Sequence, residues 1–222
     1  MIFQLQIEQV VGRPSLSGSS SDTLAYRNQL NSYLKQSART IIDMLPDEVL
    51  IKDCILTEIT DDNGVDVTDK KIVKVLRNNV GCVEMPLELK SYALSGSDSI
   101  YEPTKRAPIY YIEGQTTVGG KLFVKPTPSG SEKGQLYSAS YPTPLFSQST
   151  IGNFPDTAEY AVILGASIKL LQYRINRYLH EDEDIELAQM AQQELGTILG
   201  MYNQEMQRLG VAVQQGAPSG TN

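Results

Sequence analysis

The amino-acid sequence predicts an α+β fold: a small α-helical bundle of three main helices with an inserted β-rich module and extended termini. Three long stretches repeat apolar residues with the period of an amphipathic helix. Between the first and the second of these stretches lie short segments rich in β-branched and aromatic residues, separated by glycine, proline and asparagine. We therefore expect a helical core at 22–50 and 154–210, a β-rich insertion at 51–153, a strand arm with a flexible linker at 1–21, and a tail at 211–222.

The N-terminal segment is expected to form a short strand on a tether. Phe3, Leu5 and Ile7 alternate with polar residues, which is the period of a half-buried strand. The glycine, proline and serine residues of 12–21 then interrupt this pattern. A strand on a flexible tether can pair with its own domain or with the sheet of a neighbour, and the sequence leaves both options open.

The first predicted helix begins at Asp22, a residue type that caps helix N-termini, and ends at Pro46. Its apolar residues share one face, and they are Tyr26, Leu30, Tyr33, Leu34, Ala38, Ile41, Met44 and Leu45. This face can pack against the two C-terminal helices to make the small bundle.

Two consecutive helices are predicted within 154–209, the most strongly patterned part of the chain. The first begins at Asp156-Thr157-Ala158-Glu159, whose D-x-x-E spacing is that of a capping box. The second begins in the acidic run 182–184 and ends at Gly210. It has a single apolar stripe, so we expect one buried face and one solvated face.

The first of these two helices is apolar on two sides. One stripe consists of Tyr160, Ala161, Leu164, Ile168, Leu171, Ile175, Tyr178 and Leu179. A second, nearly opposite stripe consists of Val162, Ile163, Ala166, Leu170 and Tyr173. A helix with two apolar sides has to be covered on both. The second cover is either the same domain or a neighbouring copy of the chain, and the pattern alone favours neither.

The middle of the chain contains candidate strands at 54–60, 71–77, 107–113, 121–125 and 135–141. Asn63-Gly64 is a strong tight-turn signal, and it predicts that the first two strands form a hairpin. Gly119-Gly120 predicts a second hairpin between the third strand and the fourth.

Charge and composition narrow the possible partners. The net charge is −7, from 19 basic and 26 acidic residues. This charge argues against a site that binds nucleic acid tightly, but it suits a surface that DNA passes without adhering. No apolar run approaches the roughly 20 residues that cross a bilayer, and the N-terminus lacks the features of a signal peptide. We therefore expect folding in a cytoplasm, where Cys54 and Cys82 stay free thiols.

The sequence offers little catalytic chemistry. It has no P-loop, G-x-S-x-G, G-x-G-x-x-G or H-E-x-x-H motif. Its single histidine, His180, falls between the two C-terminal helices, and its densest basic run, 70–77, does not give one clean basic face. The aspartates of 61–69 invite a calcium hypothesis, but their spacing fails the EF-hand pattern and favours a solvated turn. We expect no enzyme activity, no cofactor and no metal.

The order of these elements resembles that of the head-to-tail adaptor (connector or neck) proteins of tailed bacteriophages. The likeness extends from Asp22 to about Leu209. The segments that carry it are RAPIYYIEG at 106–114, KLFVKPTP at 121–128, Tyr141-Pro142, and GNFPDTAEYAV at 152–162.

This resemblance implies a structural virion protein that forms a ring, commonly of twelve subunits, beneath the portal protein. The ring would join capsid to tail in the neck of the virion, after assembly in the host cytoplasm and without contact with a membrane. DNA would pass through its channel without sequence-specific binding. The helices would form the body, the β-rich module would face the tail or neck proteins, and the C-terminal tail would reach into the portal.

On this hypothesis the second apolar stripe is the subunit interface, and the tail binds the portal. The interface candidates are Val162, Ile163, Ala166, Leu170 and Tyr173. The portal-binding candidates are Val211, Ala212, Val213 and Pro218. The alternative is a tail-terminator or tail-tube component in which the β-rich module forms the ring through sheets between subunits. A virion-associated hydrolase is a third, weaker hypothesis.

Overall fold

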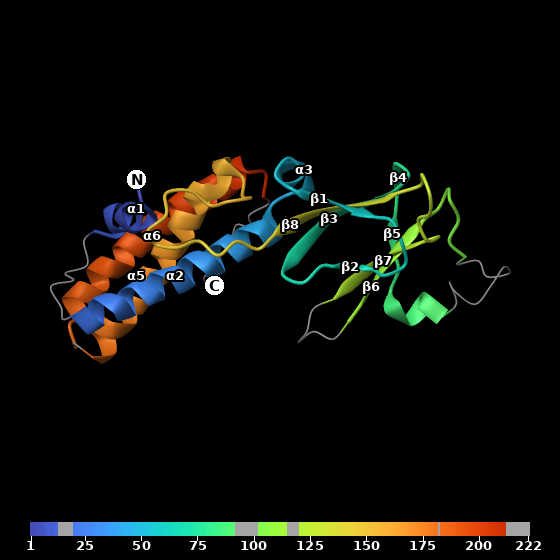
Figure 1. The fold of residues 1–222 in the computed structure, drawn as a ribbon. Helices are drawn as coiled ribbons and strands as arrows, with labels where there is room; N and C mark the ends of the chain where they lie inside the picture. The colour runs from blue at the N-terminus through green and yellow to red at the C-terminus, as the bar shows by residue number, and fades with distance from the viewer. Residues whose placement is uncertain (13–19, 92–101, 115–119, 182, 212–222) are drawn as a thin grey trace. The chain divides into compact units, whose positions relative to one another are not determined.

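The computed structural model describes residues 1–12, 20–91, 102–114, 120–181 and 183–211, apart from the side chains of 20–23 (Figure 1). The chain divides into two compact units. One, the helical unit, consists of Met1–Val49 and Pro142–Asn222, and the other, the β unit, consists of Leu50–Tyr141. The fold is α+β, as predicted, with the long helices in the first unit and two four-stranded sheets in the second.

Four helices make up most of the helical unit: α1 (Phe3–Val11), α2 (Ser20–Met44), α5 (Glu159–His180) and α6 (Ile185–Arg208). Helix α5 is central, because α1, α2 and α6 all pack against it. The chain passes from the helical unit into the β unit within the short helix α3 (Asp47–Leu50).

The prediction of an N-terminal strand was wrong, because Phe3 begins helix α1. Phe3, Ile7 and Val11 are buried at helical spacing, whereas Leu5 is exposed. The backbone N–H groups of Phe3 and Gln4 donate to the carbonyl oxygens of Gln148 and Phe146, at 2.8 and 3.0 Å. These bonds satisfy N–H groups that a helix start leaves without intrahelical partners. The linker residues 13–19 lie outside the described residues.

The segment 142–153 belongs to the helical unit, although the sequence placed it in the β-rich insertion. Phe146 is tied to α2, since its N–H donates to Asn31 Oδ1 at 2.8 Å and its ring lies under the Arg27 guanidinium. Ile151 and Phe154 are buried. The segment therefore works as a strap over the helices, and the insertion ends at Tyr141.

Helix α2 confirms the predicted helix at 22–45, with its start two residues earlier, at Ser20. Most of the face that the periodicity picked out is buried, as shown by Leu30, Leu34, Ala38 and Ile41, all 0% exposed, whereas Met44 at the end of the helix is exposed. Pro46 follows the helix, as expected.

The capping box predicted for Asp156 and Glu159 does not form. Residues Asp156–Ala158 make a 3₁₀ turn, η2, and α5 begins at Glu159 without a side-chain cap. The Glu159 carboxylate instead accepts the N–H of Ile151, in the preceding strap. The motif therefore holds a loop against the helix rather than closing the helix start.

Both predicted ends of the last helix are confirmed. Asp184 is the N-cap of α6, and its side chain accepts the Leu187 N–H at 3.0 Å. At the other end Gly210 adopts φ 79°, and the Val211 N–H donates to the Met206 carbonyl. This is the bonding of a Schellman C-cap, which a glycine in the left-handed region permits.

The β unit contains two sheets. One has the order β1 (Ile55–Ile59), β8 (Gly134–Ser140), β3 (Lys70–Arg77) and β4 (Val80–Gly81). The other has the order β2 (Val65–Asp66), β7 (Lys121–Lys125), β6 (Ile109–Glu113) and β5 (Val83–Glu84). All five predicted strands are present, and the 3₁₀ turn η1 (Leu87–Leu89) follows β5. Side chains from both sheets share one core, made of Ile59, Val67, Val75, Leu122, Val124 and Leu136.

One of the two predicted hairpins forms and the other does not. Strands β6 and β7 pair antiparallel, with Tyr111 opposite Phe123, as predicted. Strands β1 and β3, however, do not pair with each other, since β8 lies between them. Residues 61–63 form a bend and Gly64 has φ 70°, but this segment leads into β2, which pairs with β7 in the other sheet. The signal therefore marked a change of chain direction, and the pairing inferred from it was wrong.

Candidate functional site

The predicted subunit interface is largely inside the chain. Val162 and Ala166 are 0% exposed, Leu170 is 2% exposed and Ile163 is 4% exposed. These four residues are covered by the helical unit itself, so they are not a surface for a second copy. Tyr173, at 42%, is the one exposed member of the set.

The predicted portal-binding tail lies almost entirely outside the described residues, since Ala212, Val213 and Pro218 belong to 212–222. Val211 is half-buried, and its N–H takes part in the C-cap of α6. This residue therefore has a structural task at the helix end.

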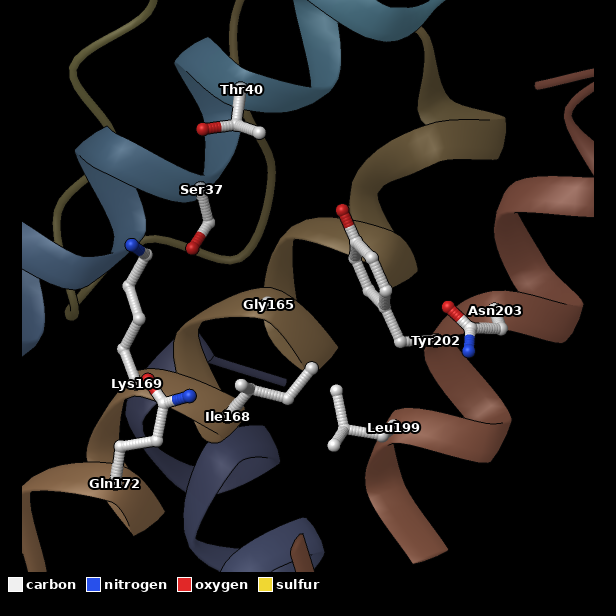
Figure 2. Close-up of a pocket in the computed structure, with 9 residues that line it drawn as sticks. All are labelled: Ser37, Thr40, Gly165, Ile168, Lys169, Gln172, Leu199, Tyr202 and Asn203. Atoms are coloured by element: carbon white, nitrogen blue, oxygen red, sulfur yellow. The ribbon is translucent and has the colours of Figure 1, made fainter. Parts of the chain in front are cut away.

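A groove of about 320 Å³ lies over the middle of α5, between α2 and α6 (Figure 2). We call it the α5 groove. Within the described residues α2 and α6 each pack on α5 but hardly touch each other, which leaves this side of α5 uncovered. The lining consists of Ser37 and Thr40 from α2, Gly165, Ile168, Lys169 and Gln172 from α5, and Leu199, Tyr202 and Asn203 from α6.

The groove combines an apolar wall with polar groups. Ser37 is 2% exposed and its Oγ has no hydrogen-bond partner. Lys169 is the only charged residue in the lining. Burial raises the pKa of the Tyr202 phenol, a group that is protonated at neutral pH even at its ordinary pKa. Figure 2 shows Ser37 on the α2 wall and Tyr202 reaching in from α6.

This groove was not predicted, although the sequence contains signals for it. Gly165 lies in the interior of α5, and a Cβ atom there would come within 3.1 Å of Ser37 Oγ, so glycine is what lets α2 approach. Gly196 and Gly200 lie within α6, where a Cβ would meet nothing within 4 Å. Glycine weakens a helix interior, so three glycines inside two helices are the sequence signal for a surface where another segment approaches the backbone closely.

A second feature of the helical unit is the exposed apolar end of the α5–α6 hairpin. We call it the hairpin tip, and define it by Leu179, Ile185, Leu187 and Met190, which are 40, 64, 42 and 60% exposed. Glu181, Glu183 and Glu186 are exposed close to these residues in the chain, and Glu181 pairs with Arg177 at 3.4 Å. The tip is therefore both apolar and acidic, a combination that a protein partner can cover.

The basic run of β3 is not a nucleic-acid surface as a whole, because Arg77 is buried. It is 2% exposed, and its Nε donates to the Pro126 carbonyl while its Nη2 pairs with Glu132, both at 2.7 Å. Lys105 pairs with the other carboxylate oxygen at 2.7 Å. The hydrogen bonds from Lys105 and Arg77 lower the pKa of Glu132. The arrangement anchors loops to the β unit.

The acidic turn also has structural partners. Asp61 accepts the Asn63 N–H, Asp66 accepts the Thr68 N–H, and Asp62 pairs with Lys125 at 2.7 Å. The part of the chain that the structure describes contains no group of three or more His, Cys, Asp or Glu residues placed to hold a metal.

The thiols and the histidine do not form a reactive constellation. Cys54 and Cys82 form no disulfide in the structure. Burial raises the pKa of the Cys82 thiol to about 11, so this cysteine is protonated at neutral pH and a poor nucleophile. His180 is the last residue of α5 and is exposed, in the interhelical position that the sequence indicated.

Comparison with known proteins does not assign the chain to a family. No protein-family model matches its sequence, and no curated protein is similar enough to be matched. Among the described helices none is long and apolar enough to cross a membrane.

Proposed function

We propose that this chain is a structural virion protein without enzymatic activity: a head-to-tail adaptor that forms a ring beneath the portal and joins capsid to tail. The observation that carries the proposal is the uncovered surface of the α5–α6 hairpin. Its tip exposes four large apolar side chains, and its middle presents the α5 groove. Exposed apolar residues gathered on one element are typical of protein interfaces.

The two-unit organisation suits a part that connects different partners. In the proposed ring the helices form the body as a small bundle, the β unit faces the tail or neck proteins, and the C-terminal tail reaches the portal. The resemblance to phage adaptors supports this arrangement and a copy number of twelve. A net charge of −7 supports passage of DNA without adhesion, because an acidic channel wall repels phosphate.

The test is the native mass of the purified protein, alone and mixed with the portal ring encoded in the same genome. We expect a free species that shifts into a complex with many copies per portal, and the mass of that complex gives the copy number. Absence of binding to the portal, together with rings or tubes formed by the protein alone, would refute the adaptor proposal.

A tail-tube or tail-terminator role is the alternative, and one observation favours it. Strand β1 lies at the edge of its sheet, and Ile55 and Leu56 on it are 37 and 48% exposed. An edge strand with exposed apolar side chains can pair with a strand of another chain.

Removal of the β unit distinguishes the two roles. Ile55 lies opposite Ser138 in the β1–β8 pair, so the two ends of this unit are close together and a short Gly-Ser linker can replace residues 51–141. The shortened protein should keep its helical circular dichroism. An adaptor should still bind the portal, whereas a tube protein should lose all assembly.

A further inference from the structure

We propose that the hairpin tip of one copy of this chain docks in the α5 groove of a second copy. The inference rests on the proposed function and deepens it, because it assigns a subunit contact to residues that the fold leaves exposed. It replaces the stripe of α5 that the sequence suggested, four of whose five residues are buried.

The α5 groove is an incomplete packing site. Helix α5 is its floor, and α2 and α6 are walls that hardly touch each other. Leu199 on the α6 wall is 38% exposed, although it is a large apolar residue. On the α2 wall, the buried Ser37 hydroxyl has no hydrogen-bond partner, which is unfavourable for a polar group shielded from water. A polar group of an occupant can satisfy this hydroxyl.

The surface of α6 next to the groove, which we call the α6 shoulder and define by Gly196 and Gly200, permits the backbone of another segment to come close. Gly196 and Gly200 lie one turn apart on α6, beside the lining residues Leu199 and Asn203, and no atom of the described chain occupies the space of a Cβ at either. No contact among the described residues of the helical unit requires glycine there. Two glycines on one helix let the backbone of another segment come nearer than side chains would allow.

The charges of the two surfaces are complementary. Lys169 is the only charged lining residue, and Glu183 and Glu186 are exposed next to Ile185 of the tip, whereas Glu181 already pairs with Arg177. Two copies with a net charge of −7 repel each other at long range. A contact that places the acidic tip on Lys169 offsets this repulsion locally and fixes the orientation of the two copies.

The two surfaces cannot meet within one molecule. Lys169 and Leu179 lie on the same helix, separated by about 15 Å at 1.5 Å per residue, so the tip can enter only the groove of another copy. Such a contact joins two different patches and is head-to-tail. Repetition of a head-to-tail contact closes into a ring when the rotation between copies allows it.

Cysteine cross-linking of the full chain tests this contact directly. In a Cys54→Ser, Cys82→Ser background, Ile185→Cys marks the tip and Asn203→Cys marks the groove, and a flexible bismaleimide joins thiols that lie close together. We expect the variant with both cysteines to give a ladder of multimers. The matched control pairs Ile185→Cys with Glu194→Cys, an exposed position of α6 outside the lining, and should give monomers.

Charge reversal is the second measurement. Lys169→Glu and Glu183→Lys should each weaken self-association about ten-fold, and the double variant should recover most of the loss. Lys35→Glu, an exposed residue outside the groove, is the control and should have no such effect. Equal cross-linking by the control pair, or unchanged association of Lys169→Glu, would overturn the inference.

The outcomes also separate this inference from the proposed function. Rings on the portal without a cross-link between tip and groove would refute the contact and leave the adaptor role intact. A cross-linked ladder without portal binding would support the contact and refute the adaptor role.

Discussion

Replacing Gly196 or Gly200 by alanine should stabilise the free chain. Both residues lie within α6, neither has a positive φ, and a Cβ at either position would meet nothing within 4 Å. Glycine costs a helix interior about 0.8–1.0 kcal/mol relative to alanine. We therefore expect each substitution to raise the free energy of unfolding by about 1 kcal/mol. The two sites lie one turn apart on the same helix, where residues four apart are neighbours, so the double variant should gain up to about 2 kcal/mol and a departure from additivity is expected.

The measurement is chemical or thermal unfolding followed by far-ultraviolet circular dichroism, at a concentration where the protein is monomeric. For a chain of this length about 1 kcal/mol corresponds to a rise in Tm of about 3 °C. Gly165→Ala is the matched control, because its Cβ would lie 3.1 Å from Cβ and Oγ of Ser37. Crowding at that site opposes the gain in helix propensity, so Gly165→Ala should stabilise less or destabilise.

The same two variants should assemble less well, because an added methyl group keeps the partner away from α6. A substitution that raises the stability of the monomer and at the same time weakens self-association cannot be explained by helix propensity alone. If Gly196→Ala and Gly200→Ala failed to stabilise the monomer, the α6 shoulder would be covered by the chain's own residues. The argument for an open groove would then be refuted.

Three further predictions concern single side chains. Glu159→Ala should lower the free energy of unfolding by about 1–2 kcal/mol, because a loop N–H loses its carboxylate acceptor, whereas Asp156→Ala removes no cap bond and should be nearly neutral in urea titrations. Leu170→Asp should abolish the helical circular dichroism signal, because it places a charge in the core. Tyr173→Asp, at an exposed position, should keep that signal. A Leu170→Asp variant that folds but does not assemble would show that Leu170 belongs to the subunit interface after all. Lys105 and Arg77 lower the pKa of Glu132 in the folded state. The charge of Glu132 therefore stabilises the β unit fully above pH 4.5, which is the ordinary pKa of the group. This stabilisation is lost as the pH falls through the lower pKa of the folded state. The difference in Tm between wild type and Glu132→Gln should therefore shrink in acid, and a difference independent of pH would contradict this reasoning.

Local signals in the sequence predicted the last helix almost completely. An acidic residue caps its start and a glycine ends it, at Asp184 and Gly210, and both act through backbone groups within a few residues. The strands were predicted equally well, because β-branched and aromatic residues dominate segments such as Lys121–Lys125. What these elements have in common is that neighbouring residues determine them.

Pairing and capping partners from distant parts of the chain could not be predicted in this way. Asn63-Gly64 signals a turn, yet it does not specify that β8 will separate β1 from β3. Glu159 has the spacing of a capping residue, yet the strap brings the Ile151 N–H close enough to take its carboxylate. In both cases the local rule identified a residue with a structural role, and a contact between distant segments decided which role.

The misplaced interface follows from the misread N-terminus. Phe3, Leu5 and Ile7 fit a period of two, but Phe3 and Ile7 also fit a helix, and five residues are too few to separate the two periods. With the segment assigned to a strand, the pattern left two covers open for the second apolar side of α5, the same domain or a neighbouring copy. In the structure α1 and α2 both pack on α5, and Arg174 Nη1 donates to the Val11 carbonyl at 3.2 Å. The second apolar side is therefore filled from within, apart from the exposed Tyr173, and an interface has to be sought among residues that remain exposed after α1 has docked. The hairpin tip and the α5 groove contain several of these residues.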